Sequence, residues 1–398
     1  MQRKISRLSP FLVIVMTIFI DVTGFGIVLP LLPYYAVVFQ AGSTELGVLV
    51  TSFALMQFIF SPVLGRLSDR IGRRPVLLLS ILTSAVSFLL FALANSFIML
   101  LLSRMVAGMA TEVGVAQAYI ADITEKKERT ARMGRMGAVN GAGFIIGPAL
   151  GGFLSTYGFS AAGYAAAALA IVNLVFALFF LPESRVNATR EQEEGKRSSI
   201  IQGLANALSK PLMGSLLAIM FTMRLAFSAF PVVMPLLAMS LFGLGSSDMS
   251  YFFVYIGLVQ IVFQGFVVGR LASKVGDGKL IAVGSLLMMS SVFPMAFFAN
   301  FGIFLVLSTV MVSGGGMLGT AIPSFISKRT SADEQGGVLG VTQSISSVAG
   351  IPGPLIGGSV YEYAGLTAPF LLSGALLAIA SAVGIRISLR ERVPSSGN

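Results

Sequence analysis

Four charged side chains lie inside long apolar stretches of this chain of 398 residues: Asp21, Arg104, Glu112 and Arg224. The chain contains no His and no Cys, which excludes Ser-His-Asp machinery, thiol nucleophiles, disulfides and metal sites built from imidazole or thiolate. Any proton chemistry must therefore use carboxyl groups or bound water. Burial favours the neutral form of a carboxyl group. Asp21 and Glu112 are thus candidate groups for taking up a proton on one side of a membrane and releasing it on the other.

The stretches around these charges are those of an integral membrane protein. Hydrophobic residues make up 55% of the chain and charged residues 11%, with a mean hydropathy of +0.88, whereas soluble domains contain about one quarter charged residues. A membrane-spanning helix needs about 20 apolar residues, and the spacing of the charges leaves room for twelve such helices. The predicted fold class is therefore all-α, with twelve transmembrane helices.

The basic residues alternate between the two ends of the predicted spans. Of the 27 Lys and Arg residues, all but Arg104 and Arg224 fall in the N-terminus, every second loop, the central linker or the C-terminus. Because positive charge is retained on the cytoplasmic side, this predicts a protein of the cytoplasmic membrane with both termini in the cytoplasm. The net charge of +10 is thus explained by topology and does not indicate nucleic acid as a partner.

The second half of the chain repeats the first at an offset of about 205 residues. Four pairs of segments match: 28–32 with 233–237, 65–72 with 269–276, 105–108 with 311–314, and 147–152 with 353–358. Six spans in each half give two parallel repeats, an architecture in which the substrate site lies near mid-membrane where the halves meet. We predict a six-helix bundle over 1–182, a cytoplasmic linker over 183–210 and a second six-helix bundle over 211–398.

A loop between the second and third spans concentrates glycines and charges: Gly65, Asp69, Arg70, Gly72, Arg73 and Arg74. This Gly-x-x-x-Asp-Arg-x-Gly-Arg-Arg pattern resembles the signature loop of the major facilitator superfamily, and the resemblance covers essentially the whole chain. It implies a transporter that moves a small molecule across a lipid bilayer. It also implies that one chain suffices, so that the protein is a monomer.

The same resemblance implies that this loop is a latch, in which Asp69 and Arg73 hold the two halves together in the outward-facing state. Asp122 and the start of the eleventh span are the candidate partners. Physically, an acid can cap a helix N-terminus, while Arg side chains bind carboxylates and helix C-termini. The alternative is that these charges serve topology alone. The second copy has Ser273 in place of Asp69, which predicts an asymmetric latch.

The fifth span carries a second pattern, formed by Gly134, Gly143, Gly147, Pro148, Gly151 and Gly152. It resembles the antiporter motif of the drug:proton antiporter branch of that superfamily. Small residues let helices approach closely and a proline bends a helix. The pattern therefore fits tight packing as well as a bent helix that shapes a cavity and limits leak. Its duplicate over 340–358 favours packing where the two halves meet.

The first span, with Asp21, Gly26, Pro30 and Pro33, resembles that of tetracycline-efflux proteins and related multidrug exporters. The resemblance implies that Asp21 binds a proton or a cationic substrate. Arg104 resembles the basic residue of the fourth span, which lies near the first span in that fold. We therefore predict an ion pair between Arg104 and Asp21, with either a role in proton coupling or a static structural role.

Four further polar side chains are candidates for binding protons or substrate. Glu112 lies eight residues beyond Arg104, roughly 12 Å along a helix, and is a proton carrier, a substrate contact or a structural group. Arg224 either neutralises Glu112 or binds an anionic group of the substrate. Gln57 and Asn140 are candidate substrate contacts. The 31 Phe and 19 Met residues could line an adaptable apolar cavity.

Taken with the resemblance, these residues predict a proton-coupled exporter that moves small amphipathic compounds or drugs by alternating access. The alternative is a metabolite or sugar carrier of the same fold, working as a symporter or uniporter. Tetracycline exporters carry an acidic residue in the third span, but residues 75–94 have no charge, so tetracycline is not specified as the substrate. No enzyme, cofactor or metal is predicted, because the chain has no catalytic or metal-ligating motif and no Gly-x4-Gly-Lys-Ser/Thr nucleotide loop.

Overall fold

The computed structural model describes the chain except for residues 1–8, 111, 126–127, 185–210, 330–334 and 392–398. The described residues form helices joined by turns, with no strand among them. Their contacts divide the chain into two compact units, one formed by residues 1–189 and 243–257 and the other by residues 190–242 and 258–398. Most of the predicted linker, from residue 185 to 210, lies outside the described residues.

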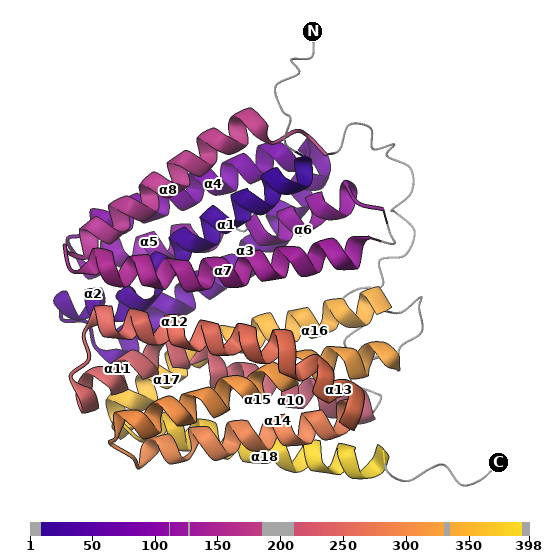
Figure 1. The fold of residues 1–398 in the computed structure, drawn as a ribbon. Coiled ribbons are helices and arrows are strands. Elements are labelled where there is room, and N and C mark those ends of the chain that lie inside the picture. The colour runs from indigo at the N-terminus through magenta and orange to yellow at the C-terminus, as the bar shows by residue number, and fades with distance from the viewer. Residues whose placement is uncertain (1–8, 111, 126–127, 185–210, 330–334, 392–398) are drawn as a thin grey trace. The chain divides into compact units, whose positions relative to one another are not determined.

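The first half of the chain forms six helical spans (Figure 1). Its helices are α1 (Pro10–Val28), α2 (Leu32–Val38), α3 (Ser43–Ile71), α4 (Arg73–Ala92), α5 (Phe97–Met109), α6 (Glu112–Asp122), α7 (Arg129–Ser155) and α8 (Phe159–Phe180). A 3₁₀ turn, η1 (Leu29–Leu31), joins α1 to α2, because Pro30 and Pro33 lack the backbone N–H that a continuous α-helix uses. α1 with α2, and α5 with α6, each form one span.

The second half repeats this pattern. Its elements are α10 (Pro211–Ser228), α11 (Phe230–Phe242), α12 (Ser246–Val262), η2 (Phe263–Val268), α13 (Gly269–Val275), α14 (Asp277–Val292), η3 (Pro294–Ala296), α15 (Phe301–Lys328), α16 (Gln335–Gly350), α17 (Pro352–Ala364) and α18 (Ala368–Glu391). α10 and α11 form one span bent by 40°. The π-helical η2 carries α12 into α13, and Pro352 begins α17 directly after α16.

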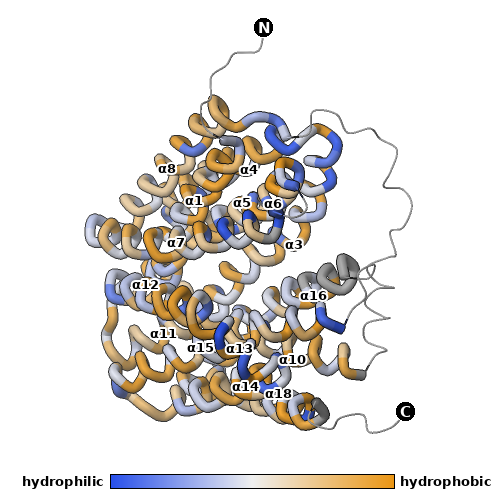
Figure 2. The backbone as a smooth tube through the Cα atoms, turned by 45° about the vertical axis from the view of Figure 1, so that its right-hand side comes forward, coloured by the Kyte–Doolittle hydropathy of each residue, from blue (hydrophilic) through white to orange (hydrophobic). Residues whose placement is uncertain are grey.

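The helices have the lengths and apolar surfaces of membrane spans. Ten segments of the described chain, together with the bent pair α10–α11, are long and apolar enough to cross a membrane. α16 and α17, which are separated only by Ile351, lie where the sequence predicts the eleventh span, so the arrangement is consistent with twelve helices. Figure 2 shows that the helices are mostly hydrophobic along their lengths, while hydrophilic residues gather near their ends. Helices suit a bilayer because they satisfy their backbone hydrogen bonds internally.

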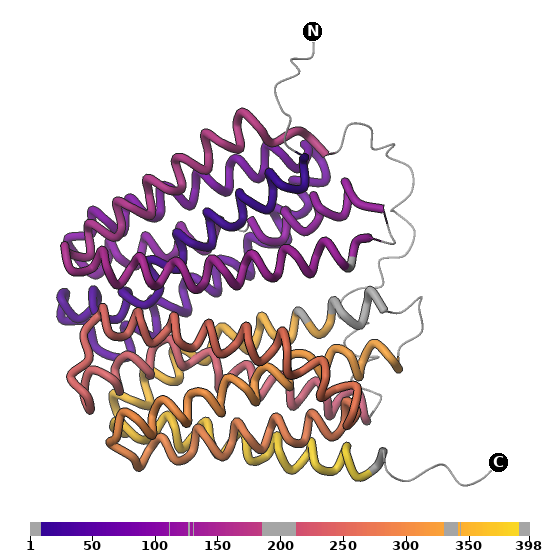
Figure 3. Tube along the Cα trace, in the orientation of Figure 1, coloured from indigo at the N-terminus to yellow at the C-terminus, as the bar shows by residue number. Residues whose placement is uncertain are grey.

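The two halves pack their helices in the same way. In the first unit, α1 packs against α7 and α8, and α4 packs against α5 and α8. In the second unit, α10 packs against α16 and α18, and α14 packs against α15 and α18. The trace in Figure 3 shows these neighbours side by side within each unit. The repeat found in the sequence is therefore a repeat of helix packing.

Candidate functional site

Three helices of the first unit bring two acids and a serine together. Asp21 of α1 and Glu112 of α6 are hydrogen-bonded through their carboxyl groups, and Ser84 of α4 bonds to both. The Ser84 hydroxyl donates to Glu112 Oε1 over 2.8 Å, and both of these side chains are buried. A hydrogen bond between two carboxyl groups needs a proton on one of them, so the pair can hold one proton.

The helix of the fourth span is interrupted just before Glu112. α5 ends at Met109, Ala110 has an extended backbone with ψ of 92°, and α6 begins at Glu112. The prediction that Arg104 and Glu112 lie on one continuous helix is therefore wrong. α6 packs against α1 and α4, so its first residue lies beside the helices that carry the other two members of the cluster.

Arg104 does not join the carboxyl pair. Its side chain is 2% exposed, its Nε donates to Ser103 Oγ over 3.4 Å, and its guanidinium carbon lies 5.6 Å from the centre of the Phe91 ring. Its Nη2 is buried without a hydrogen-bond partner among the described residues. The predicted ion pair between Arg104 and Asp21 is therefore wrong: Asp21 is bonded to Glu112 instead.

The two neutral candidates differ in their surroundings. Gln57 is exposed on α3 and lies outside the carboxyl cluster. Asn140 lies on α7, and its Oδ1 is buried without a partner in the described part of the chain. Because α7 packs against α1, the helix of Asp21, Asn140 stays a candidate for binding substrate.

Three glycines of the fifth-span pattern face α1: Gly143, Gly147 and Gly151. A Cβ added at Gly147 would lie 2.6 Å from the backbone oxygen of Thr23, which no real Cβ tolerates. At Gly134, by contrast, an added Cβ would meet no atom within 4 Å. Close packing by these three glycines is confirmed. For these three glycines the partner is α1, a helix of the same half, and the predicted packing against the other half is found only at Gly152, which meets Ser250 of α12.

The other two residues of the pattern have separate environments. α7 continues through Pro148 as one helix. A Cβ added at Gly152 would lie 2.7 Å from Ser250 Cβ, and the Gly152 carbonyl accepts a hydrogen bond from Ser247 over 3.0 Å. Both serines lie in residues 243–257, which belong to this same unit.

Arg73, the first residue of α4, is the centre of an ion-pair cluster in the signature loop. Its Nη1 lies 2.7 Å from Asp69 Oδ1 and its Nε lies 3.0 Å from Asp122 Oδ2. Nη1 also donates to Ser68 Oγ over 2.6 Å. The predicted partnership with Asp122 is confirmed, and contact with the start of the eleventh span stays a prediction. Arg70, in the same loop, is exposed.

Glu183, which the charge pattern predicts to lie in the linker, completes this cluster. Its carboxylate accepts the backbone N–H groups of Arg73 and Arg74 over 2.9 and 3.1 Å, and so caps the N-terminus of α4. Gly72 has φ of +104°, a backbone conformation that favours glycine, and a Cβ there would collide with the Glu183 carboxylate. Both the backbone and the available space therefore require glycine at this position. The sequence signal for this contact is that Glu183 directly follows the end of the sixth span, at the same membrane face as the loop between the second and third spans.

The second half builds the corresponding ion pair with its charges exchanged. The offset that aligns the two loops places Asp277 at the position of Arg73. The offset that aligns the fourth span with the tenth places Lys328 at the position of Asp122. Lys328 Nζ lies 2.7 Å from Asp277 Oδ2. As the first residue of α14, Asp277 also interacts favourably with the helix dipole. The asymmetry predicted from Ser273 thus extends to the sign of the ion pair.

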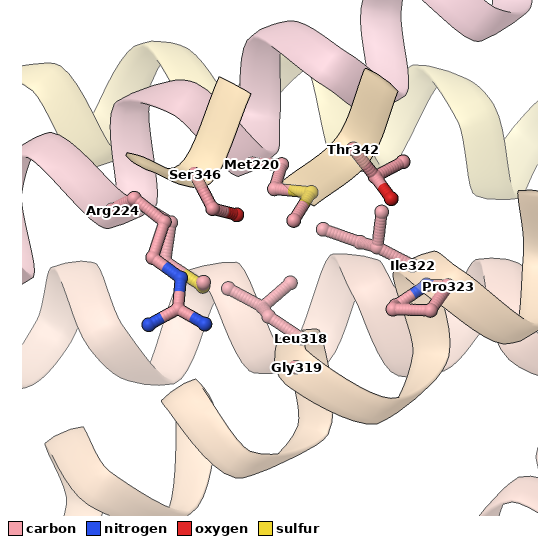
Figure 4. Close-up of a pocket in the computed structure, with 9 residues that line it drawn as sticks. Met220, Arg224, Leu318, Gly319, Ile322, Pro323, Thr342 and Ser346 are labelled. Carbon is pink, nitrogen blue, oxygen red and sulfur yellow. The ribbon is translucent and has the colours of Figure 1, made fainter. Parts of the chain in front are cut away.

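Arg224 lies on α10 in the second unit, where it borders a cavity of about 350 Å³ (Figure 4). The cavity is lined by residues of α10, α15 and α16. Among the described residues, no acid forms an ion pair with Arg224. Glu112, the acid that the sequence suggested as its partner, is bonded to Asp21 and Ser84.

Comparisons with known proteins agree with this architecture. The family model described as Major Facilitator Superfamily matches residues 14–354 and 257–398. The tetracycline resistance protein, class E, of Escherichia coli is 35% identical over 352 residues, covering 87% of this chain and 86% of that protein. Multidrug resistance protein 2 of Bacillus subtilis (strain 168) is 28% identical over 386 residues, covering 96% and 95%. A solved structure of a bacterial homologue of the human lysosomal transporter Spinster, inward-facing and occupied, matches with a TM-score of 0.79 at 16% identity, covering 97% of this chain and 98% of that one.

Proposed function

Because this chain belongs to the major facilitator superfamily of membrane transporters, we propose that it couples proton entry to the export of small amphipathic compounds or drugs. Several of its relatives are named for resistance to tetracycline or to multiple drugs. We propose that export takes place by alternating access across the cytoplasmic membrane. In this proposal both termini lie in the cytoplasm and one chain is the functional unit.

The observation that carries this proposal is the hydrogen-bonded pair of Asp21 and Glu112. Two ionised carboxylates in contact inside a membrane protein would repel each other and lose hydration, so the pair favours a state with one proton. Ser84 donates to Glu112 and holds its carboxyl group beside Asp21. An antiporter needs a group that keeps its proton while it is shielded from water and releases the proton when water reaches it.

The position of the pair links its protonation to helix packing. Asp21 lies on α1, Glu112 begins α6 and Ser84 belongs to α4, so a change in the charge of the pair acts on three helices at once. A ligand shifts a conformational equilibrium only through its different affinity for the two states. The proton meets this condition if only one state of these helices gives water access to the pair.

One proton in each cycle supplies enough driving force. A unit charge that crosses a potential of 100 mV is worth about 2.3 kcal/mol. That free energy corresponds to roughly a 50-fold ratio of substrate concentrations. A single coupled proton can therefore maintain a useful export gradient.

Proton movement driven by substrate in proteoliposomes tests the proposal. The purified protein is reconstituted around a trapped pH-sensitive dye, and amphipathic compounds are added one at a time. We expect transported compounds to move protons in the opposite direction. Asp21→Asn and Glu112→Gln should each abolish this coupled movement. Glu128→Gln, which removes an acid paired with Arg132 at the surface, should behave as the wild type.

The same assay can reject the proposal. Wild-type proton movement in both Asp21→Asn and Glu112→Gln would remove the carboxyl pair from the mechanism. Substrate movement without protons, or with protons in the same direction, would identify the protein as a uniporter or symporter instead.

A further inference from the structure

The cavity of the second unit is formed where three helix faces converge. Each of α10, α15 and α16 contributes two lining residues that are four positions apart: Met220 and Arg224, Leu318 and Ile322, and Thr342 and Ser346. Residues four apart lie on one face of a helix, and Figure 4 shows these side chains around a common space. A volume of about 350 Å³ is in the range of pockets that bind small molecules.

Arg224 forms no ion pair with an acid in the described part of the chain. Five acids follow α12 in the sequence, all outside the predicted spans: Asp277, Asp333, Glu334, Glu362 and Glu391. Of these, Asp277 is paired with Lys328. A guanidinium within a membrane span is costly unless it faces a partner or a polar cavity. The charge of Arg224 is therefore available to a ligand.

Ser346 supplies a second and independent polar group. It is 9% exposed, and its Oγ is buried without a hydrogen-bond partner among the described residues. Helical serines commonly donate to the carbonyl three or four residues earlier, as Ser308 does to Phe304 over 2.7 Å. Because a buried hydroxyl without a partner is unfavourable, Ser346 has a donor to offer to a ligand in the cavity.

The repeat places this cavity at the counterpart of the carboxyl pair. The offset that aligns the fifth with the eleventh span matches Ser346 with Asn140, whose Oδ1 is also buried and unpartnered in the described chain. The offset that aligns the fourth with the tenth span matches Leu318 with Glu112. An apolar residue thus stands where the first half has an acid, so no carboxylate competes with a ligand for Arg224.

We propose that this cavity binds the carboxylate of an amphipathic compound, with Arg224 as its charge partner and Ser346 as its hydrogen-bond donor. The inference rests on the proposed export function, because it names the chemical class of the substrate: a small apolar body that carries one carboxylate. Met220, Met223 and Leu318 form the apolar wall around that body. The flexible methionines adapt to bodies of different shape.

Binding of 2-naphthoate to the purified protein tests this assignment. The protein is placed in phosphatidylcholine nanodiscs without any gradient, and the ligand fluorescence is read against empty nanodiscs, since the chain itself has no Trp. We expect saturable binding of 2-naphthoate and binding of its methyl ester that is about tenfold weaker or worse. Arg224→Gln should weaken 2-naphthoate binding by about tenfold or more, and Ser346→Ala by severalfold. Equal affinity for acid and ester, or unchanged affinity in Arg224→Gln, would overturn the proposal.

Leu318→Glu and Leu318→Gln provide a matched pair of variants. The glutamate would place a carboxylate beside Arg224 and compete with the ligand, whereas the glutamine has nearly the same shape without the charge. We expect 2-naphthoate binding to be lost in Leu318→Glu and retained in Leu318→Gln, with thermal unfolding used to confirm that both are folded. Equal binding in the two folded variants would show that the charge of the ligand is not recognised at Arg224.

A single-cysteine variant gives a readout that needs no bound ligand. The chain has no Cys, so Ser346→Cys introduces the only thiol. Each reagent's rate with the introduced thiol is divided by its rate with a free thiol in solution. By this measure a negatively charged methanethiosulfonate should react about tenfold faster than a positively charged one of similar size. This preference should vanish when Arg224→Gln is added. If the preference for the negative reagent remains in Arg224→Gln, the positive potential in the cavity comes from another group, and the proposal is overturned.

An anionic lipid headgroup offers the same chemistry as the proposed ligand. The titration is therefore repeated in nanodiscs that contain phosphatidylglycerol. Unchanged 2-naphthoate affinity supports a small compound as the occupant, and loss of binding would assign the cavity to lipid instead. None of these measurements uses a proton gradient. Failure of the cavity assignment in Arg224→Gln is thus seen separately from failure of proton coupling in Asp21→Asn.

Discussion

Replacing Arg73 alone by Asp should destabilise the first unit. Arg73 is 9% exposed and is bonded to Asp69, Asp122 and Ser68. Removing one partner of a buried ion pair costs about 3–5 kcal/mol in free energy of unfolding. Because Asp69 is 44% exposed and Asp122 is 28% exposed, water screens the interaction, and we expect the lower end of that range, about 3 kcal/mol. The new carboxylate would also face two acids.

Exchanging the whole set of charges should recover most of this loss. The second half already makes the exchanged pair, with Asp277 and Lys328 2.7 Å apart. A triple variant copies its residues into the first half: Asp69→Ser, Arg73→Asp and Asp122→Lys. We expect more than half of the lost stability to return. A residual loss is expected because the new carboxylate lies beside Glu183, which caps the same helix.

Thermal unfolding of the purified protein in one detergent measures these effects. Arg66→Asp is the matched control, because Arg66 is an exposed residue near the end of α3 whose Nε donates to the Pro62 carbonyl over 3.1 Å. The control should unfold near the wild-type temperature, the triple variant somewhat lower, and Arg73→Asp lowest. A triple variant no more stable than Arg73→Asp would refute the equivalence of the two ion pairs.

Three further changes test packing, capping and burial by the same thermal assay. Gly147→Leu should destabilise the protein far more than Gly134→Leu, because an added side chain collides with α1 only at the first position; equal effects would contradict this. Glu183→Gln should cost about 1–2 kcal/mol through the lost charge at the start of α4, and an unchanged unfolding temperature would refute the capping role. Arg104→Met should raise thermal stability, because it removes a buried guanidinium with an unpartnered nitrogen. A less stable Arg104→Met would reveal an interaction of Arg104 beyond those described.

The helices and their repeat could be predicted from the sequence because the protein spans a membrane. Each span must be apolar over about 20 residues, so charged loops divide the chain into spans. The repeated segments then pair each span of the first half with its counterpart in the second. The contact of Arg73 with Asp122 could also be predicted, because two opposite charges lie at the same membrane face in adjacent loops.

The partners of Asp21 and Arg73 depend on features that leave no local pattern. The break between α5 and α6 contains no proline, and Glu112, directly after it, is hydrogen-bonded to Asp21 of another helix. Glu183 caps α4 across 110 residues of sequence. Such long-range contacts are fixed by how the helices pack, and neither apolar length nor charge spacing specifies that packing.

The two halves have kept their helix packing and diverged in chemistry, which constrains how coupling can work. In our proposals the proton binds at Asp21 and Glu112 of the first unit, and a carboxylate binds at Arg224 of the second. The two ligands then do not compete for one side chain, so coupling must act through a conformational change that both ligands bias. Such linkage is reciprocal, so proton binding must alter substrate affinity. We expect the affinity for 2-naphthoate to vary with pH in a range where the ligand stays ionised, and the double variant Asp21→Asn/Glu112→Gln to bind it without that variation. A pH dependence that persists in the double variant would place the coupling proton elsewhere.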